Sequence, residues 1–317
     1  MNGESKSPAK GRTARRRRIT LLNRLEFALA LTLGAFFRLV GVDAASAISG
    51  GFTRFIGPKL KGLSNRARRN LQIAFPDMEK AEQDAIIRDV WENLGRTAAE
   101  FAHLDKFNPD TDNPRLEIIG REKIYGLAES GGPALCVSGH FANWELMAVA
   151  LNAAGVKNAI IYRAANNPLL DALIIKERGR VMSRRQIAKG KRGGREMIDA
   201  VKSGATIAML IDQKLTTGGV ASPFFGKPAM TAPAAARLAL KYDAPIYIGR
   251  IERLLGAHFR LTVSDPVAFE PSGDMNADIQ SLTDRLNLEI EKLVRANPGQ
   301  WLWLHRRWPK EEYRRRD

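Results

Sequence analysis

The sequence is poor in the residues that cross-link a protein or hold a metal ion. Its 317 residues include one cysteine, Cys136, and four histidines. A single cysteine excludes an internal disulfide, so a reducing compartment is compatible with the chain. So few thiolate and imidazole ligands argue against a structural zinc site. We therefore predict that the protein uses no metal.

Acidic residues are also scarce relative to basic ones. The chain has 34 Asp and Glu against 50 Lys and Arg, which gives a formal net charge of +16. This excess implies a polyanionic neighbour: nucleic acid, an anionic membrane or a phosphorylated substrate. A nucleic-acid-binding protein is expected to carry a basic helix or an aromatic-studded sheet motif. Neither is visible, so no nucleic-acid partner is predicted.

A long uninterrupted apolar run is missing as well. A membrane-spanning helix needs about 20 apolar residues, and the charge-free run 27–37 reaches that length only by including Arg38 and Asp43. A basic arm, residues 1–26, precedes the run, and further basic residues follow it. Positive charge on both sides favours a segment in the surface of an anionic leaflet, so residues 27–50 are predicted to attach the protein to a membrane. A signal peptide cleaved after 45–47 and a soluble core helix stay open as alternatives.

The remaining sequence divides into a helical region and an alternating region. Apolar residues recur at helical spacing between Leu71 and Lys106, and Asn-Pro pairs then break the chain. We predict a helical region at residues 51–110 and an α/β domain at 111–317. Strands are expected at residues 134–138, 159–162, 206–211, 245–251 and 258–263. Helices are expected at residues 143–154, 168–182, 195–202, 232–242 and 275–296. The predicted fold class is α/β, with a mainly parallel sheet flanked by helices, a helical N-terminal part and an N-terminal membrane-attachment helix.

The first strand-to-helix junction carries the strongest chemical signal. In open α/β sheets, sites lie at the carboxyl edge, and there His140 follows Gly139 directly. A histidine at this edge suits proton transfer near neutral pH. If the next helix begins near Phe141, the carboxylate of Glu145 reaches the imidazole and fixes its tautomer. A helix-capping or core histidine is the alternative. No Gly-x-Ser-x-Gly motif exists and Cys136 lies inside a strand, so an enzyme-bound acyl intermediate is not expected.

Polar residues near other predicted strand ends are candidates for substrate binding. Arg163 and Arg180 follow the second strand and are assigned to phosphate-bearing headgroups, because guanidinium forks match phosphate geometry. For Arg180 a solvated basic face is an equal alternative. Residues 189–194 are predicted to form a basic loop. Asp212 and Gln213 end a strand, where they either bind sugar hydroxyls or simply form a turn.

Taken together, the motifs resemble the late acyltransferases of lipid A biosynthesis, the lauroyl/myristoyl acyltransferase family within the His-x4-Asp/Glu glycerolipid acyltransferase superfamily. The matching blocks occur in the family's order over roughly residues 20–310. They are Arg69-Asn70-Leu71 with Phe75-Pro76-Asp77, Gly139-His140-Phe141-Ala142-Asn143-Trp144-Glu145, Tyr162-Arg163 with Asn167-Pro168-Leu169, Asp212-Gln213 with Phe225-Gly226 and Thr231, and residues 300–308.

The resemblance implies a reaction and a location. A fatty acyl group passes from acyl carrier protein to a hydroxyl of a (Kdo)-lipid A precursor, forming a secondary acyloxyacyl ester without a cofactor. His140 is then the general base, oriented by Glu145, with Arg163 or backbone N–H groups after His140 stabilising the oxyanion. The cytosolic donor implies the cytoplasmic side of a bacterial inner membrane. Coenzyme A as donor, another glycolipid acceptor such as a phosphatidylinositol mannoside, and a non-catalytic basic membrane- or nucleic-acid-binding protein remain alternatives.

Overall fold

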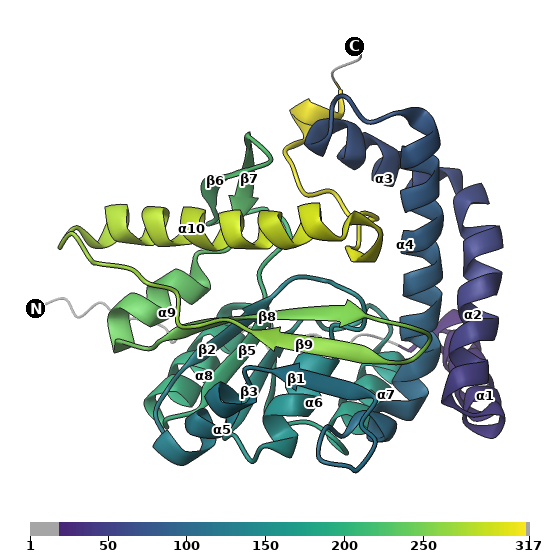
Figure 1. The fold of residues 1–317 in the computed structure, drawn as a ribbon, viewed down its shortest axis with the longest axis horizontal. Coiled ribbons are helices and arrows are strands. Elements are labelled where there is room, and N and C mark those ends of the chain that lie inside the picture. Colours follow the sequence, from purple (N-terminus) through teal and green to yellow (C-terminus); the bar gives the residue numbers. More distant parts are fainter. Residues whose placement is uncertain (1–18, 315–317) are drawn as a thin grey trace, which may run out of the picture.

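A seven-stranded sheet forms the centre of the molecule (Figure 1). The structure, a computed structural model, describes residues 19–314, so the Arg15–Arg18 block lies outside the described residues. The strands are, in sheet order, β1 (Leu116–Ile119), β9 (Phe259–Val263), β8 (Ile246–Arg253), β2 (Leu135–Ser138), β5 (Thr206–Leu210), β3 (Asn158–Tyr162) and β4 (Gln186–Ala188). All neighbours pair in parallel except β8 and β9. The predicted mainly parallel sheet is confirmed.

Helices cover both faces of this sheet. Successive strand residues point to opposite faces, and accordingly Leu135 and Val137 of β2 enter one core cluster while Cys136 enters the other. The first cluster is closed by α8 (Lys191–Lys202), α9 (Ala234–Tyr242) and α10 (Met275–Ala296). The second is closed by α5 (Arg121–Ser130) and α6 (Leu146–Ala153). With α7 (Pro168–Arg178) they give the flanking layers that the sequence predicts.

The N-terminal part is helical, with two helices where one attachment helix was expected. Helices α1 (Leu21–Val40) and α2 (Val42–Ile56) meet at Gly41, whose φ of 82° is open to glycine but strained for other residues. Helices α3 (Lys61–Ala74) and α4 (Lys80–Glu100) follow. At one end of the molecule α2 packs along the long α4, and α1 contacts α7 (Figure 1). Within residues 19–314, no helix combines the length and apolar character required to cross a membrane.

The sequence analysis did not predict several short strands. It missed β1 and β4 at the two edges of the sheet, and it missed a separate hairpin of β6 (Val220–Phe224) and β7 (Lys227–Thr231). Edge strands and hairpins of so few residues give too little hydrophobic periodicity to stand out. The predicted basic loop at 189–194 is wrong, because Gly190 caps α8 and that helix begins at Lys191.

The C-terminal segment Gln300–Trp308, here called the C-terminal block, returns to the helical region. The side-chain amide of Asn70 on α3 donates hydrogen bonds to the backbone oxygens of Trp303, at 2.6 Å, and His305, at 2.8 Å. Asn70 is completely buried. The helical region and the C-terminal block therefore share one core.

Candidate active site

Two neighbouring strands bring His140 and Asp212 together. Strands β2 and β5 pair in parallel, with Ser138 opposite Leu210, so their carboxyl ends meet. His140 and Asp212 follow those two strand ends at equal spacing. Nδ1 of His140 lies 2.7 Å from Oδ1 of Asp212, and the backbone N–H of His140 donates to Oδ2, also at 2.7 Å. The carboxylate thus accepts hydrogen bonds from both the ring and the main chain of the histidine.

These contacts determine which ring nitrogen is basic. A carboxylate can only accept hydrogen bonds, so Nδ1 of His140 carries the proton and Nε2 has a free electron pair. Nε2 in turn accepts a hydrogen bond from the side-chain amide of Gln213 at 3.2 Å. The nitrogen that faces the pocket can therefore accept a proton, while Nδ1 is held by an anion.

Asp212 is shielded from solvent, and it stays ionised. Burial raises the pKa of this carboxyl, but the charge of His140 and the hydrogen bonds that His140 donates outweigh burial, so the net pKa is lowered. Because Asp212 lies behind the ring and its side chain has no exposed surface, its predicted role in binding sugar hydroxyls is wrong. Its partner in that prediction, Gln213, does line the pocket.

The segment between Gly139 and Glu145 is an irregular loop held by α4. A Cβ at Gly139 would come within 2.7 Å of the Phe141 ring, so only glycine fits there. Ala142 has a φ of 44°, and its carbonyl accepts hydrogen bonds from the side chains of Asn93 and Thr97, each at 3.0 Å. These contacts explain why α6 does not begin near Phe141 but only at Leu146.

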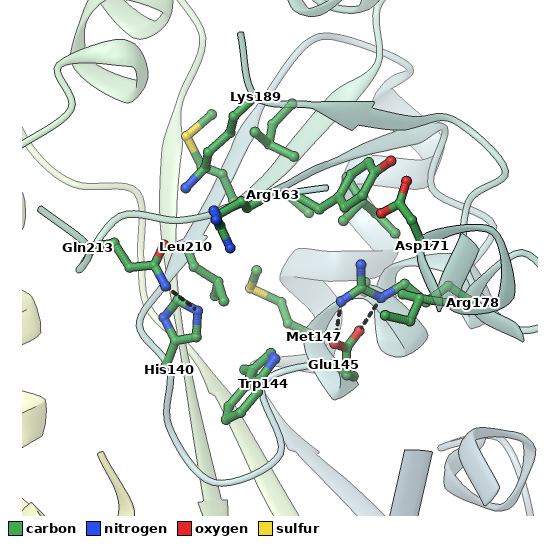
Figure 2. Close-up of a pocket in the computed structure, with 17 residues that line it drawn as sticks. His140, Trp144, Glu145, Met147, Arg163, Asp171, Arg178, Lys189, Leu210 and Gln213 are labelled. Carbon is green, nitrogen blue, oxygen red and sulfur yellow. Dashed lines mark hydrogen bonds and ion pairs between the residues drawn. The ribbon is translucent and has the colours of Figure 1, made fainter. Parts of the chain in front are cut away.

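This late helix start changes the place of Glu145. Its carboxylate forms a two-pronged ion pair with Arg178 of α7, at 2.8 and 2.5 Å, and both side chains are largely buried. The prediction that Glu145 holds the His140 ring is wrong, because Asp212 occupies that position. Glu145 instead forms, with Arg178, a charged wall of the same pocket (Figure 2).

The pocket has a volume of about 190 Å³ and opens at the carboxyl edge of the sheet. Figure 2 shows His140 and Gln213 on one side, the Glu145–Arg178 pair on the other, and Arg163 between them. Arg180 does not reach it: that side chain pairs with Glu177 and lines a second cavity beside α1 and α2. Sequence reasoning assigned no role to the pocket residues Trp144, Met147, Tyr162, Asp171 and Arg178, and it placed Lys189 in the basic loop.

His305 of the C-terminal block lies beside His140 but carries no positive charge near pH 7. Its ring centre is 5.8 Å from that of His140, and neither of its nitrogens has a partner among the described residues. Burial lowers the pKa of His305 to about 4. The ring is therefore neutral near pH 7 and adds no positive charge next to His140.

The buried ion pair gives a prediction about stability. Glu145→Ala and Arg178→Ala should each lower the free energy of unfolding by about 3 kcal/mol, because each leaves one charge buried without its partner. The double variant should lose less than the sum of the two. Urea denaturation followed by circular dichroism measures this. Glu117→Ala, which breaks the half-exposed pair with Arg260, is the control and should cost less than about 1 kcal/mol. Equal losses at both sites would contradict a structural role for the pair.

Comparison with known proteins identifies the family of this chain. The model of the family described as bacterial lipid A biosynthesis acyltransferase matches residues 13–310. The chain belongs to this family. It is therefore an O-acyltransferase, and the resemblance stated from the motifs is confirmed.

Individual relatives agree with this assignment. A lipid A biosynthesis myristoyltransferase of Escherichia coli (strain K12) is 27% identical over 262 residues, which are 79% of this chain and 76% of the relative. A lipid A biosynthesis acyltransferase of Haemophilus influenzae is 28% identical over 249 residues, 76% of each protein. A lipid A biosynthesis lauroyltransferase of Escherichia coli (strain K12) is 26% identical over 258 residues, 78% of this chain and 81% of the relative. The acyl chains in these names differ, so the family assigns the reaction but not the chain length.

Proposed function

We propose that this acyltransferase moves a fatty acyl group from acyl carrier protein to a hydroxyl of a (Kdo)-lipid A precursor, with His140 as general base. The observation that carries the proposal is the contact between Nδ1 of His140 and the buried Asp212 carboxylate, which leaves Nε2 on the pocket side to accept a proton. An alcohol attacks a thioester slowly unless its proton is removed, and such general base action contributes about 10²- to 10⁴-fold.

The reaction needs no metal or cofactor. The acceptor oxygen attacks the thioester carbonyl carbon as its proton passes to Nε2 of His140, and Asp212 stabilises the imidazolium that forms. The tetrahedral intermediate then collapses, the carbon–sulfur bond breaks, and the proton returns from Nε2 to the departing thiolate. The products are an ester and the free thiol of the donor.

Arg163 is the favoured oxyanion donor among the candidates. The backbone N–H groups of Phe141 and Ala142 already donate to the carbonyls of Gly139 and Gln300, both at 2.9 Å. Arg163 lines the pocket and, within residues 19–314, makes one hydrogen bond, to Asn166 at 3.2 Å, which leaves other guanidinium N–H groups for a substrate. Lys189 lines the same pocket, so two cations are available there to phosphate groups or to the developing oxyanion. Glu145 contributes by holding Arg178 in the pocket wall.

The helices α1 and α2 are the proposed membrane attachment. They carry most of the large exposed apolar side chains of the described residues: Leu21, Leu22, Leu25, Leu29, Leu31, Leu33, Phe36, Leu39, Ile48, Phe52 and Phe55. No residue of α1 is buried. Such a concentration of exposed apolar side chains on two helices marks an interaction surface, and nearby cations such as Lys59, which lies 3.6 Å from the Phe55 ring centre, suit anionic headgroups.

The attachment surface lies next to the pocket through α7. Asn167, at the start of α7, donates to the backbone oxygen of Asn23 on α1 at 2.9 Å. Farther along, Arg38 of α1 pairs with Glu177 at 2.6 Å, adjacent in sequence to the pocket residue Arg178. Helix α7 thus contacts the attachment helix α1 and also lines the pocket. A lipid acceptor held in the membrane surface would lie close to His140. This arrangement supports attachment to the surface of the bacterial inner membrane, and the proposed cytosolic donor places the pocket on the cytoplasmic side.

Membrane attachment by this surface predicts a large change in partitioning. The triple variant Leu29→Glu, Phe36→Glu and Phe52→Glu should bind vesicles that contain phosphatidylglycerol at least tenfold more weakly, because each buried apolar side chain contributes about 1.5–3 kcal/mol. Co-sedimentation measures this. The control is Leu254→Glu with Leu255→Glu, two exposed leucines outside the surface. Equal binding by both variants would refute this attachment. Point variants are preferable to deleting residues 1–50, because α2 packs on α4.

Purified protein with defined donors and acceptors tests the function. With dodecanoyl or tetradecanoyl acyl carrier protein and a Kdo-bearing lipid A precursor, mass spectrometry should show a product heavier by one fatty acid less one water. The same chains on coenzyme A should react more slowly. A phosphatidylinositol mannoside as acceptor tests the other glycolipid. Transfer to it alone, or no transfer to any acceptor, would refute the proposal.

A further inference from the structure

The C-terminal block forms the rear wall of the His140 loop. The backbone N–H of Leu302 donates to the carbonyl of His140 at 3.1 Å, and that of Ala142 donates to the carbonyl of Gln300 at 2.9 Å. Phe141 and Trp301 face each other across this short antiparallel bridge. Trp301 is completely buried. Its position relative to the base is therefore set by main-chain bonds on both sides.

From this position the indole of Trp301 reaches the carboxylate behind His140. Its Nε1–H donates to Oδ2 of Asp212 at 2.8 Å. The same oxygen accepts the backbone N–H of His140, while Oδ1 is left to the ring. The indole is locked by its neighbours, because the Trp303 ring packs edge-on with centres 4.5 Å apart. A rigid neutral donor thus shares one oxygen of the catalytic carboxylate.

The other two tryptophans of the block make the same kind of hydrogen bond to different groups. Nε1 of Trp303 donates to the carbonyl of Pro298 at 2.8 Å, and Nε1 of Trp308 donates to the carbonyl of Phe224 at 3.1 Å. Both side chains are as deeply buried as Trp301. Trp308 offers a matched comparison, equal in burial and chemistry but bonded to a different acceptor, whereas Trp303 packs directly on the Trp301 ring.

We propose that Trp301 is a positioning residue for acyl transfer, whose indole N–H holds Asp212 in the orientation that faces Nδ1 of His140 and withdraws part of its charge from the imidazole. This inference rests on the proposed function, in which His140 is the base. Without the indole, the carboxylate can turn about its broad terminal torsion, and its charge is shared among fewer donors. The carboxylate would then stabilise the His140 imidazolium more strongly, so His140 would lose its proton and become available as a base only at higher pH.

Other charged or titratable groups also face the His140–Asp212 pair, and the variants leave them in place. They are His305 and Arg307 from the C-terminal block, Arg163 and Lys189 from the strand ends, Glu145 at the start of α6 and Arg178 of α7. Arg307 is fully buried and donates to Thr231 and Asn287. A change in pH dependence that appears in the Trp301 variant alone therefore reports on the indole.

The test compares Trp301→Phe with Trp308→Phe in the transfer assay between pH 5 and 9. For Trp301→Phe we expect kcat to fall about tenfold with KM changed less than twofold, and the acid limb of the kcat/KM profile to move to higher pH. The Trp308→Phe control should lower the melting temperature by a similar amount but keep the wild-type profile. Equal effects on kcat in both variants, or an unmoved acid limb, would overturn the proposal.

A double-variant cycle shows whether Trp301 acts through Asp212. In an Asp212→Asn background, Trp301→Phe should change kcat less than twofold, because the carboxylate it serves is gone. The full tenfold loss in that background would also overturn the proposal.

A spectroscopic measurement tests the inference where a variant does not fold. It also applies if the wild-type protein has no transferase activity, an outcome that would refute the proposed function. With ¹⁵N-labelled tryptophan, Asp212→Asn should shift the Trp301 indole signal and leave those of Trp303 and Trp308 unmoved. An insensitive Trp301 signal refutes the inference independently of the reaction.

Discussion

Asp212→Asn should reduce kcat by about 10²- to 10⁴-fold while the protein stays folded. The reason lies in the two oxygens. Oδ2 accepts two N–H groups, from the His140 backbone and the Trp301 indole, so the amide oxygen of the substituted side chain would occupy that place. Its NH₂ group would then face Nδ1 of His140 and donate to it. The ring would carry its proton on Nε2, the wrong tautomer for a base. In a serine protease triad the equivalent substitution lowers kcat about 10⁴-fold.

Single-turnover transfer from acyl carrier protein, together with a melting curve, measures this effect. Asp278→Asn is the matched control, since Asp278 is also buried and accepts backbone and hydroxyl hydrogen bonds, from Ser272, far from the pocket. It should retain wild-type kcat. Glu145→Gln completes the comparison: if Glu145 rather than Asp212 oriented the ring, the larger loss of kcat would fall on Glu145.

His140→Ala should lower kcat by about 10²- to 10⁴-fold, the usual contribution of a general base. The folded state should persist, because the His140 side chain borders the pocket and its removal leaves the backbone bonds to Asp212 and Leu302 in place. His258→Ala, at an exposed histidine next to β9, should be indistinguishable from wild type. Transfer within about threefold of wild type in His140→Ala would exclude this histidine as the base. Membrane binding should be the same in all three proteins.

Local patterns predicted the parts of the fold that have strong periodicity. The helix at 275–296 has the predicted bounds, and the strands at 159–162 and 206–211 begin or end within a residue of β3 and β5. The strand-end positions of His140, Arg163 and Gln213 were likewise visible in the sequence, and the structure places all three in one pocket. Arg180 was predicted for the same reason, but its side chain lines a different cavity.

The ordered motifs and the strand-to-helix junction were thus determined by the sequence alone, because they depend on residues close together in the chain. Which carboxylate meets His140 was decided only by the tertiary structure. Asp212 reaches it because β5 inserts between β2 and β3, an order that no local periodicity encodes. Glu145, although nearer in sequence, is drawn to Arg178 because the loop before α6 is tied to α4. Sequence proximity predicted Glu145 as the partner of His140, but long-range packing places Asp212 there instead.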